Sequence, residues 1–204
     1  MTVIFLVLAL AAAGPEGMEC AQWHSSGPTL AFCLAPGARD GGRVLAVYRA
    51  AADPTGDSAW TLLFRDRDRG HHPWKIMTTE LDGDPLPEVA VICEKPVPHD
   101  PTPKNRLQVW DWDGERLFPL WLGSRLGSDL IDATFVPGPD GLDRLVSLEH
   151  DRDRAVMLRR WAWNGFGFSY EIDLARIDRP HDLDASISRL RQRMVELQTQ
   201  GEIK

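Results

Sequence analysis

The chain has 204 residues, 43% of them hydrophobic and 26% charged, with a formal net charge of −7. This length suits one domain with a sizeable core and leaves little room for a second full domain. Acidic and basic residues are mixed along the chain rather than gathered into the basic stripe that phosphate binding needs, so we expect no nucleic-acid partner.

The chain opens with an apolar run from Val3 to Ala13 that ends at Gly14-Pro15. The run is too short for the roughly 20 residues that span a bilayer, but it suits the core of a signal peptide. Ala11 and Ala13 supply the small residues of a cleavage site, so residues 1–13 are predicted to be a signal peptide. A buried N-terminal strand or helix is the alternative. We expect a secreted or periplasmic protein without a transmembrane segment.

Cys20 and Cys33 flank the turn signal Ser25-Ser26-Gly27-Pro28. Two cysteines that face each other across a hairpin can be bridged in an oxidising compartment, so we predict a disulfide between them. Cys93 ends the apolar run that begins at Val89, and we expect it to be a buried, unpaired thiol.

A polar turn followed by a short apolar run recurs three times and predicts three repeat units. The copies are Asp40–Arg43 before Val44–Tyr48, Asp84–Glu88 before Val89–Cys93, and Asp140–Arg144 before Leu145–Glu149. Between the second and third copies, Lys95–Lys104 holds four prolines. Proline cannot donate to a β-ladder, so this stretch is predicted to be a surface loop.

Two Trp-x-Trp pairs, each followed by a turn dipeptide, predict two β-hairpins. The first runs Trp110 to Gly114 with Asp-Gly, and the second runs Trp161 to Gly165 with Asn-Gly. These dipeptides readily adopt the positive φ angles of tight hairpin turns. Tryptophans two positions apart lie on one face of a strand, so we expect both pairs to pack between neighbouring sheets.

We therefore expect residues 14–179 to form an all-β, propeller-like array of three or four short antiparallel sheets. A closed propeller needs at least four blades of roughly 40 residues each. Three units can be traced, which leaves a degenerate fourth blade, an open array or closure by dimerisation.

Residues 180–204 predict an amphipathic helix that begins after Pro180 and ends at Gly201. Its apolar side chains recur in steps of four and three: Leu183, Ile187, Leu190, Met194 and Leu197. This stripe either packs on the chain's own sheet or binds a partner, by self-association or through a partner helix. We take its five residues as candidate partner-binding residues.

The segment Glu80–Glu88, followed by the apolar strand Val89–Ile92, resembles the FG-GAP or VCBS repeat of integrin-α-type β-propellers. The Trp-x-Trp-Asp-Gly hairpin downstream is similar to the second half of such a blade. The likeness covers about residues 74–172, with a weaker echo in 29–64. It implies a propeller-like fold whose loops bind Ca²⁺.

Position by position, the resemblance implies Glu80, Asp82 and Asp84 as Ca²⁺ ligands, with Glu88 as the closing acid. Ca²⁺ takes six to eight oxygen ligands and favours carboxylates on a tight loop. Glu80 and Pro85 stand where the family usually has Asp and Gly. The alternative is a turn whose acids are simply solvated.

No catalytic signature is present, neither a Gly-x-Ser-x-Gly elbow nor a His-Glu-x-x-His nor a Cys-x-x-Cys pair. We expect a secreted, non-enzymatic β-repeat binding or scaffold protein, with a protein or glycan as partner. The alternative is a hydrolase that uses two carboxylates on the same framework. A concave pocket holding two acids with shifted pKa values would favour the hydrolase.

Overall fold

The computed structural model describes residues 15, 17–24, 27–38, 42–51, 60–67, 71–97, 100–123, 126–151 and 155–201. The predicted signal peptide, residues 1–13, lies outside these ranges.

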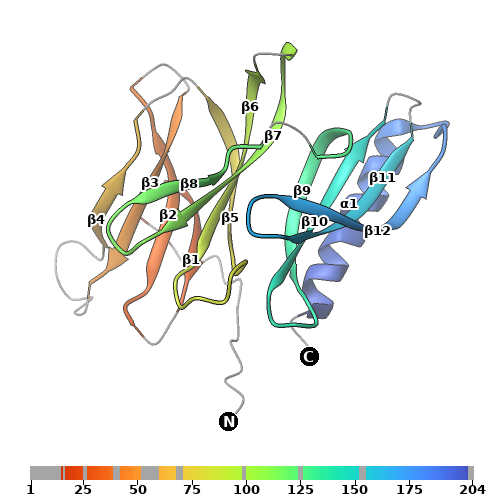
Figure 1. Cartoon of the computed structure of the whole chain (residues 1–204). Coiled ribbons are helices and arrows are strands. Elements are labelled where there is room, and N and C mark those ends of the chain that lie inside the picture. Colours follow the sequence, from red (N-terminus) through yellow and green to blue (C-terminus); the bar gives the residue numbers. More distant parts are fainter. Residues whose placement is uncertain are drawn as a thin grey trace.

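The described residues form three four-stranded antiparallel sheets and one C-terminal helix, in agreement with the predicted array of three or four sheets (Figure 1). Each sheet is formed by four consecutive strands. The first sheet holds β1 (Glu19–Trp23), β2 (Leu30–Pro36), β3 (Arg43–Ala50) and β4 (Trp60–Arg65). The second holds β5 (His72–Thr79), β6 (Glu88–Val97), β7 (Asp100–Trp112) and β8 (Leu117–Trp121). The third holds β9 (Asp129–Pro137), β10 (Asp143–His150), β11 (Val156–Trp163) and β12 (Phe168–Ile177), and the helix is α1 (Leu183–Gly201).

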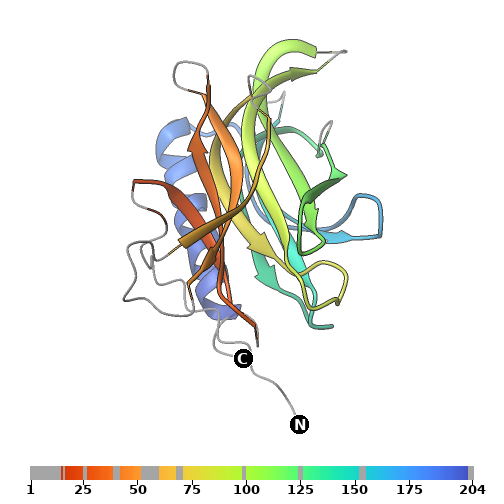
Figure 2. The same cartoon turned by 90° about the vertical axis from the view of Figure 1, so that its left-hand side faces the viewer.

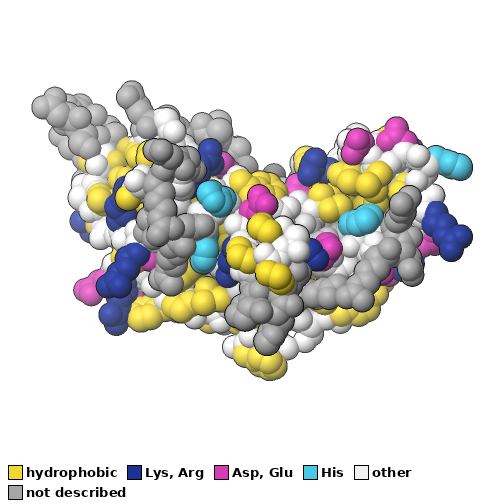
Figure 3. Space-filling model, turned by 90° about the horizontal axis from the view of Figure 1, so that it is seen from above, with side chains coloured by type: hydrophobic (Ala, Val, Ile, Leu, Met, Phe, Trp, Pro, Cys, Tyr) yellow, Lys and Arg dark blue, Asp and Glu magenta, His cyan; other side chains and the backbone are white. Residues whose placement is uncertain are grey.

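The sheets follow one another in space in chain order, with the second sheet in the middle and α1 against the third (Figure 1). Viewed from the first sheet, they overlap one behind the other (Figure 2). Seen from above, the outline of the molecule is indented between the first-sheet end and the third-sheet end (Figure 3). The described residues therefore form an open array of three sheets.

Two apolar cores lie between the sheets, and a third lies under the helix. The first core joins the first and second sheets, and the second core joins the second and third sheets. Strand β6 contributes to both, because Val89 and Val91 face the first core whereas Ala90 and Ile92 face the second. Burial on both faces explains why this strand reads as a continuous apolar run.

Both predicted hairpins are present at equivalent places, as the β7–β8 and β11–β12 turns. Asp113 Oδ1 accepts hydrogen bonds from the amides of Glu115 and Arg116, at 2.9 and 2.8 Å. Asn164 Oδ1 accepts the two matching bonds in its own turn. Gly114 and Gly165 have φ angles of +98° and +96°, which glycine adopts without strain. Trp112 is buried in the first core and Trp161 in the second, so the tryptophans pack between sheets as expected.

The prediction of a surface loop over Lys95–Lys104 is wrong. The stretch extends β6 and β7 into a long hairpin in which Lys95 pairs with Lys104. The pairing of β5 with β6 ends at His72–Glu94, so the extension is a two-stranded ribbon with both outer edges free of neighbouring described strands. Proline is tolerated there, because its missing N–H can point away from the ladder.

The first of the three predicted repeat copies is also shifted by one strand. The second and third copies precede β6 and β10, the second strands of their sheets. The first copy precedes β3, which is the third strand of the first sheet. Alternation alone cannot give a strand its place in a sheet, because every antiparallel hairpin has a polar turn and an apolar strand.

Candidate functional site

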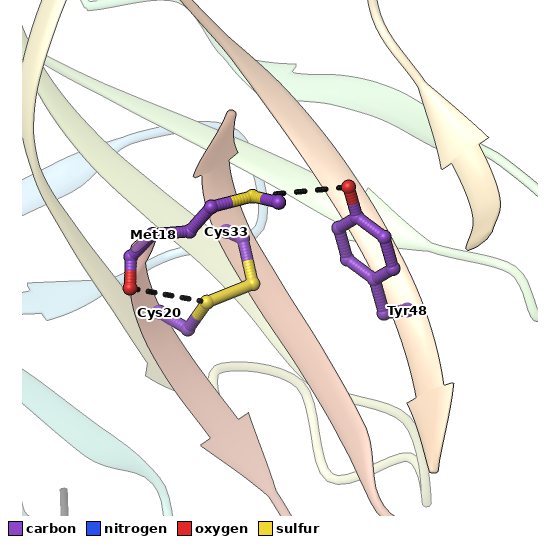
Figure 4. Close-up of a disulfide and its surroundings, with 4 residues drawn as sticks. All are labelled: Met18, Cys20, Cys33 and Tyr48. Atoms are coloured by element: carbon purple, nitrogen blue, oxygen red, sulfur yellow. Dashed lines mark hydrogen bonds between the residues drawn. A yellow bond between two sulfur atoms is a disulfide. The ribbon is translucent and has the colours of Figure 1, made fainter. Parts of the chain in front are cut away.

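The predicted disulfide between Cys20 and Cys33 is confirmed. The two residues are direct partners in the β1–β2 register (Figure 4). The Tyr48 hydroxyl lies 3.8 Å from the Met18 sulfur on the same outer face of the first sheet. Cys93 is free and buried, as expected, and burial raises the pKa of its thiol to about 11.

The acidic loop, residues 80–87, connects β5 to β6 at one end of the second sheet. Leu81 is 1% exposed and lies in the second core, whereas Leu86 packs against the first core. Gly83 has a φ angle of +89°, which allows the chain to turn between them. The loop is therefore anchored at both interfaces of the middle sheet.

Three of the four predicted Ca²⁺ ligands hold the turns of this loop. Glu80 Oε1 accepts the Gly83 amide at 2.7 Å, Asp82 Oδ1 accepts the Asp84 amide at 3.0 Å, and Asp84 Oδ1 accepts the Leu86 amide at 2.6 Å. Among the described residues, no three His, Cys, Asp or Glu side chains form a group that could hold a metal ion. The structure thus gathers these carboxylates on one loop but does not converge them on one point.

The fourth predicted ligand, Glu88, is fully buried and differs from the other three. Its Oε2 accepts the Leu81 amide at 2.7 Å, while its Oε1 has no hydrogen-bond partner. Within the described residues, Glu88 forms no ion pair with a cationic side chain. Burial, reinforced by the charges of Asp82 and Glu80, raises its pKa to about 8.

Asp111 belongs to the same acidic group, although it lies outside the loop. It is the direct partner of Glu88 in the β6–β7 register. Burial raises its pKa, and the nearby charges of Asp84 and Asp82 raise it further. Sequence reasoning placed Asp111 only as the residue between two tryptophans. The signal that could have found it is the register of β6 against β7, which fixes which acids face each other.

Asp143 ties the acidic loop to the third sheet. Its Oδ2 accepts the Thr79 hydroxyl at 2.9 Å and the Glu80 amide at 3.0 Å. Its own amide donates to the Glu80 carbonyl at 2.7 Å. Burial raises the pKa of Asp143. The loop and the β9–β10 turn therefore share one hydrogen-bonded junction.

The third sheet contains a second buried carboxylate, Glu149, and both of its oxygens have hydrogen-bond partners. Its oxygens accept bonds from the Ser128 amide and the Ser147 hydroxyl, each at 2.5 Å. The Arg159 guanidinium lies 3.1 Å away and also pairs with Asp173. This network was not predicted, because nothing in the local sequence joins residues 128, 149 and 159.

The apolar stripe of α1 packs against the third sheet. Leu190 and Met194 are buried there, Ile187 and Leu197 are partly buried, and Leu183 is 40% exposed. Asp132 on β9 accepts Arg191 of the helix at 2.9 Å and Lys75 of β5 at 2.8 Å. The chain's own sheet thus covers four of the five candidate partner-binding residues, which corrects their assignment to a partner surface. No described helix is long and apolar enough to cross a membrane.

Of the cavities among the described residues, two beside the second sheet are not lined by the acidic loop. The larger, about 40 Å³, lies between the first and second sheets and is lined by Arg43, His71, Cys93 and Trp110 among others. The smaller, about 10 Å³, lies beside Arg106 and Trp121. Neither of these two cavities is lined by Glu80, Glu88, Asp111 or Asp143, the acids whose pKa values are raised.

No family model, no curated protein and no solved structure matches this chain.

Proposed function

We propose that the protein is an exported β-repeat binding or scaffold protein whose acidic loop binds Ca²⁺. The observation that carries the proposal is the Glu88 carboxylate, which is 0% exposed and has one oxygen without a partner. A buried carboxyl group without an opposite charge either holds a proton or binds a metal. Glu88 has further acids as neighbours and a pKa raised to about 8, so a bound cation would take the place of that proton.

The donor set suits Ca²⁺. Each loop carboxylate uses one oxygen on a backbone amide, and a carboxylate has two. Glu80, Asp82, Asp84 and Glu88 together can therefore offer about four oxygens to a hard cation without breaking the turns of the loop. Because no three of these acids are grouped in the structure, cation binding would require the carboxylates to move toward one another. The resemblance of the loop to FG-GAP or VCBS repeats supports the same assignment.

The disulfide supports an oxidising location, secreted or periplasmic, because such bonds persist mainly outside the cytosol. Extracellular Ca²⁺-binding modules work with dissociation constants of about 10⁻⁴ to 10⁻³ M. The role of the cation would be structural: it would fix a loop that is anchored in both cores, and with it the arrangement of the three sheets that would present a surface to a protein or glycan partner.

Thermal unfolding in Ca²⁺ and in a chelator tests the proposal, because a ligand that binds only the folded state must raise the midpoint. At a Ca²⁺ concentration of 100 times Kd we expect a stabilisation of about 2.7 kcal/mol. The double substitution Asp82→Asn with Asp84→Asn should remove this gain. Asp140→Asn, in the corresponding loop of the third sheet, is the matched control and should retain it. Equal midpoints in Ca²⁺ and in chelator for the unmodified protein would exclude the site.

A further inference from the structure

The larger of the two cavities beside the second sheet lies against the first sheet, at the end of β5 and β6 opposite to the acidic loop. Its lining includes Pro73 and Cys93, which are partners near the last pair of the β5–β6 register. The cavity measures about 40 Å³, and a buried water needs roughly 10 to 15 Å³. It therefore has room for about three atoms of the size of a water molecule, which is the size of a carboxylate group.

Gln108 on β7 is a buried polar residue in the lining of this cavity. It is 3% exposed and pairs with Val91, a residue of the first core, so its amide group faces the gap between the first and second sheets. With the described residues, the Gln108 side-chain amide forms no hydrogen bond. Buried polar groups are nearly always hydrogen-bonded, to protein or to a bound molecule. The Gln108 amide therefore indicates a polar group that the chain itself does not supply.

The equivalent residue of the third sheet finds its partner within the chain. Gln108 precedes Trp110 by two positions, and Arg159 precedes Trp161 by the same spacing in the matching hairpin. The Arg159 guanidinium pairs with the buried Glu149 at 3.1 Å. The same strand position is thus satisfied internally in the third sheet, whereas in the second sheet it faces a cavity.

Arginine side chains give the lining of this cavity a positive charge. Arg43 and Arg67 line it with one acid, Asp66, although the formal net charge of the whole chain is −7. The Arg43 guanidinium pairs with Glu19 at 3.0 Å, whereas Arg67 forms no ion pair with a described carboxylate. A guanidinium can bind a carboxylate through two parallel hydrogen bonds. The Arg67 guanidinium therefore matches an anionic ligand.

The rest of the lining favours a carboxylate over a phosphate. A phosphate group carries about 1.5 to 2 negative charges and three acceptor oxygens, and Asp66 would repel it. A carboxylate carries one charge and two oxygens, which match one guanidinium and one amide donor. Leu34, Leu45 and Val91 also line the cavity, and their apolar side chains suit the carbon chain of an organic acid.

We propose that this cavity binds the carboxylate group of a small organic acid. Arg67 would pair with both oxygens, the Gln108 amide would donate to one of them, and the apolar lining would contact the carbon chain. The site does not depend on the proposed Ca²⁺ site, because its residues lie at the other end of β5 and β6. It adds a small-molecule ligand to a protein whose proposed role is binding.

The test is a titration of the ¹⁵N-labelled protein with sodium propionate at constant ionic strength, in which NMR follows the side-chain amide signals of Gln108. We expect a saturable shift of these signals. Arg67→Ala should weaken propionate binding about tenfold or more, because a charge-assisted pair of hydrogen bonds is lost. Arg193 is an exposed arginine of α1 that pairs with Glu196, so Arg193→Ala is the matched control and should bind propionate like the unmodified protein.

Gln108→Leu separates a binding role from a structural one. Replacing an unpartnered buried amide with an apolar side chain should keep or raise the midpoint of thermal unfolding, while propionate binding is lost. Cys93 lines the same cavity, so its alkylation gives the readout for this variant. Propionate should slow the alkylation of Cys93 in the unmodified protein and have no effect in Gln108→Leu. Equal protection in both proteins would argue against the site.

Other probes test the class of ligand. Propionamide lacks the charge and should leave the Gln108 signals unchanged. A saturable shift with inorganic phosphate and none with propionate would overturn the carboxylate assignment. N-acetylalanine presents its carboxylate as a peptide terminus does, and binding much tighter than that of propionate would replace the small acid with a chain end. Shifts that grow linearly with propionate, or equal affinities of Arg67→Ala and the unmodified protein, would contradict a specific site.

Discussion

Glu88 in the second sheet and Glu149 in the third are both completely buried, yet their surroundings are opposite. Glu149 accepts two close hydrogen bonds and is paired with Arg159. Glu88 accepts one backbone amide, has an unpartnered oxygen, and faces Asp111. A charge that is neutralised within the chain supports the fold by itself. A charge left without a partner indicates either a proton or a ligand.

The largest expected effect comes from removing the Arg159 guanidinium, which pairs with the buried Glu149. Arg159→Ala leaves Glu149 buried and unpaired, and we expect a loss of about 3 to 5 kcal/mol in the free energy of unfolding, measured by denaturant titration at pH 7. The neighbouring Arg160 pairs with Glu171 at the surface, where its side chain is 41% exposed. Arg160→Ala should cost less than about 1 kcal/mol. Equal costs for the two substitutions would show that the Glu149 network is not a buried ion pair in solution.

The second prediction concerns the dependence of stability on pH in chelator. The pKa of Glu88 rises from 4.5 to about 8 on folding, so the folded protein holds this proton more tightly than the unfolded chain. Its contribution to stability is therefore complete below pH 4.5 and is lost as the pH rises through about 8. We expect the free energy of unfolding to fall by about 1.4 kcal/mol per pH unit within that window.

Thermal melts between pH 4.5 and 9 measure this effect, with Glu88→Gln as the variant that should lack it. The pKa values of Glu80, Asp111 and Asp143 are also raised, so they add to the slope in the same direction. Ca²⁺ should oppose the slope, because metal ligands must be deprotonated to bind. A stability that rises with pH in chelator would contradict the buried, unpaired state of Glu88.

The junction between the two sheets should have a smaller effect. Asp143→Ala leaves the Thr79 hydroxyl and the Glu80 amide without their acceptor, and we expect a cost of about 2 kcal/mol. Asp140→Ala removes a salt bridge whose carboxylate is 50% exposed, and it should cost less than about 1 kcal/mol. Denaturant titration of both variants compares them, and a ranking in the reverse order would argue against the junction.

The last prediction uses the alkylation rate of Cys93 to measure how often the second sheet opens, without any substitution. Cys93 is the only cysteine outside the disulfide, is buried on β6, and has a thiol pKa raised to about 11. An alkylating reagent should therefore label it only when the second sheet opens. Mass spectrometry over time should show slower labelling in Ca²⁺ than in chelator. Rapid labelling of the folded protein in both conditions would show that β6 is accessible.

Local patterns predicted the elements that depend on neighbouring residues. Asp-Gly and Asn-Gly predicted both hairpin turns, because the turn is determined by the backbone freedom of glycine and one side-chain acceptor. A turn signal between Cys20 and Cys33 predicted the disulfide. The helix was visible in the spacing of Leu190, Met194 and their neighbours. Each of these signals is contained within about 20 residues of chain.

Patterns of the same kind failed where long-range pairing decides the outcome. Pro96, Pro101 and Pro103 lie in a two-stranded ribbon because no third described strand reaches that far, and this depends on where β5 and β8 end rather than on the segment itself. The shift of the first repeat copy has the same origin. The packing of the apolar side of α1 could not be predicted without knowing which face of the third sheet the other sheets leave uncovered.

The sequence by itself determined the apolar strands at Val44–Tyr48, Val89–Cys93 and Leu145–Glu149, the two hairpin turns, the disulfide and the helix, because these follow from backbone preferences and alternation along the chain. Only the tertiary structure decided that Glu88 is buried opposite Asp111, whereas Glu149 is buried beside Arg159. The cost of a buried charge depends on what reaches it from other strands, and strand register over tens of residues is not encoded in any local pattern. The surroundings of the candidate site therefore depend on strand register as well as on which residues the chain contains.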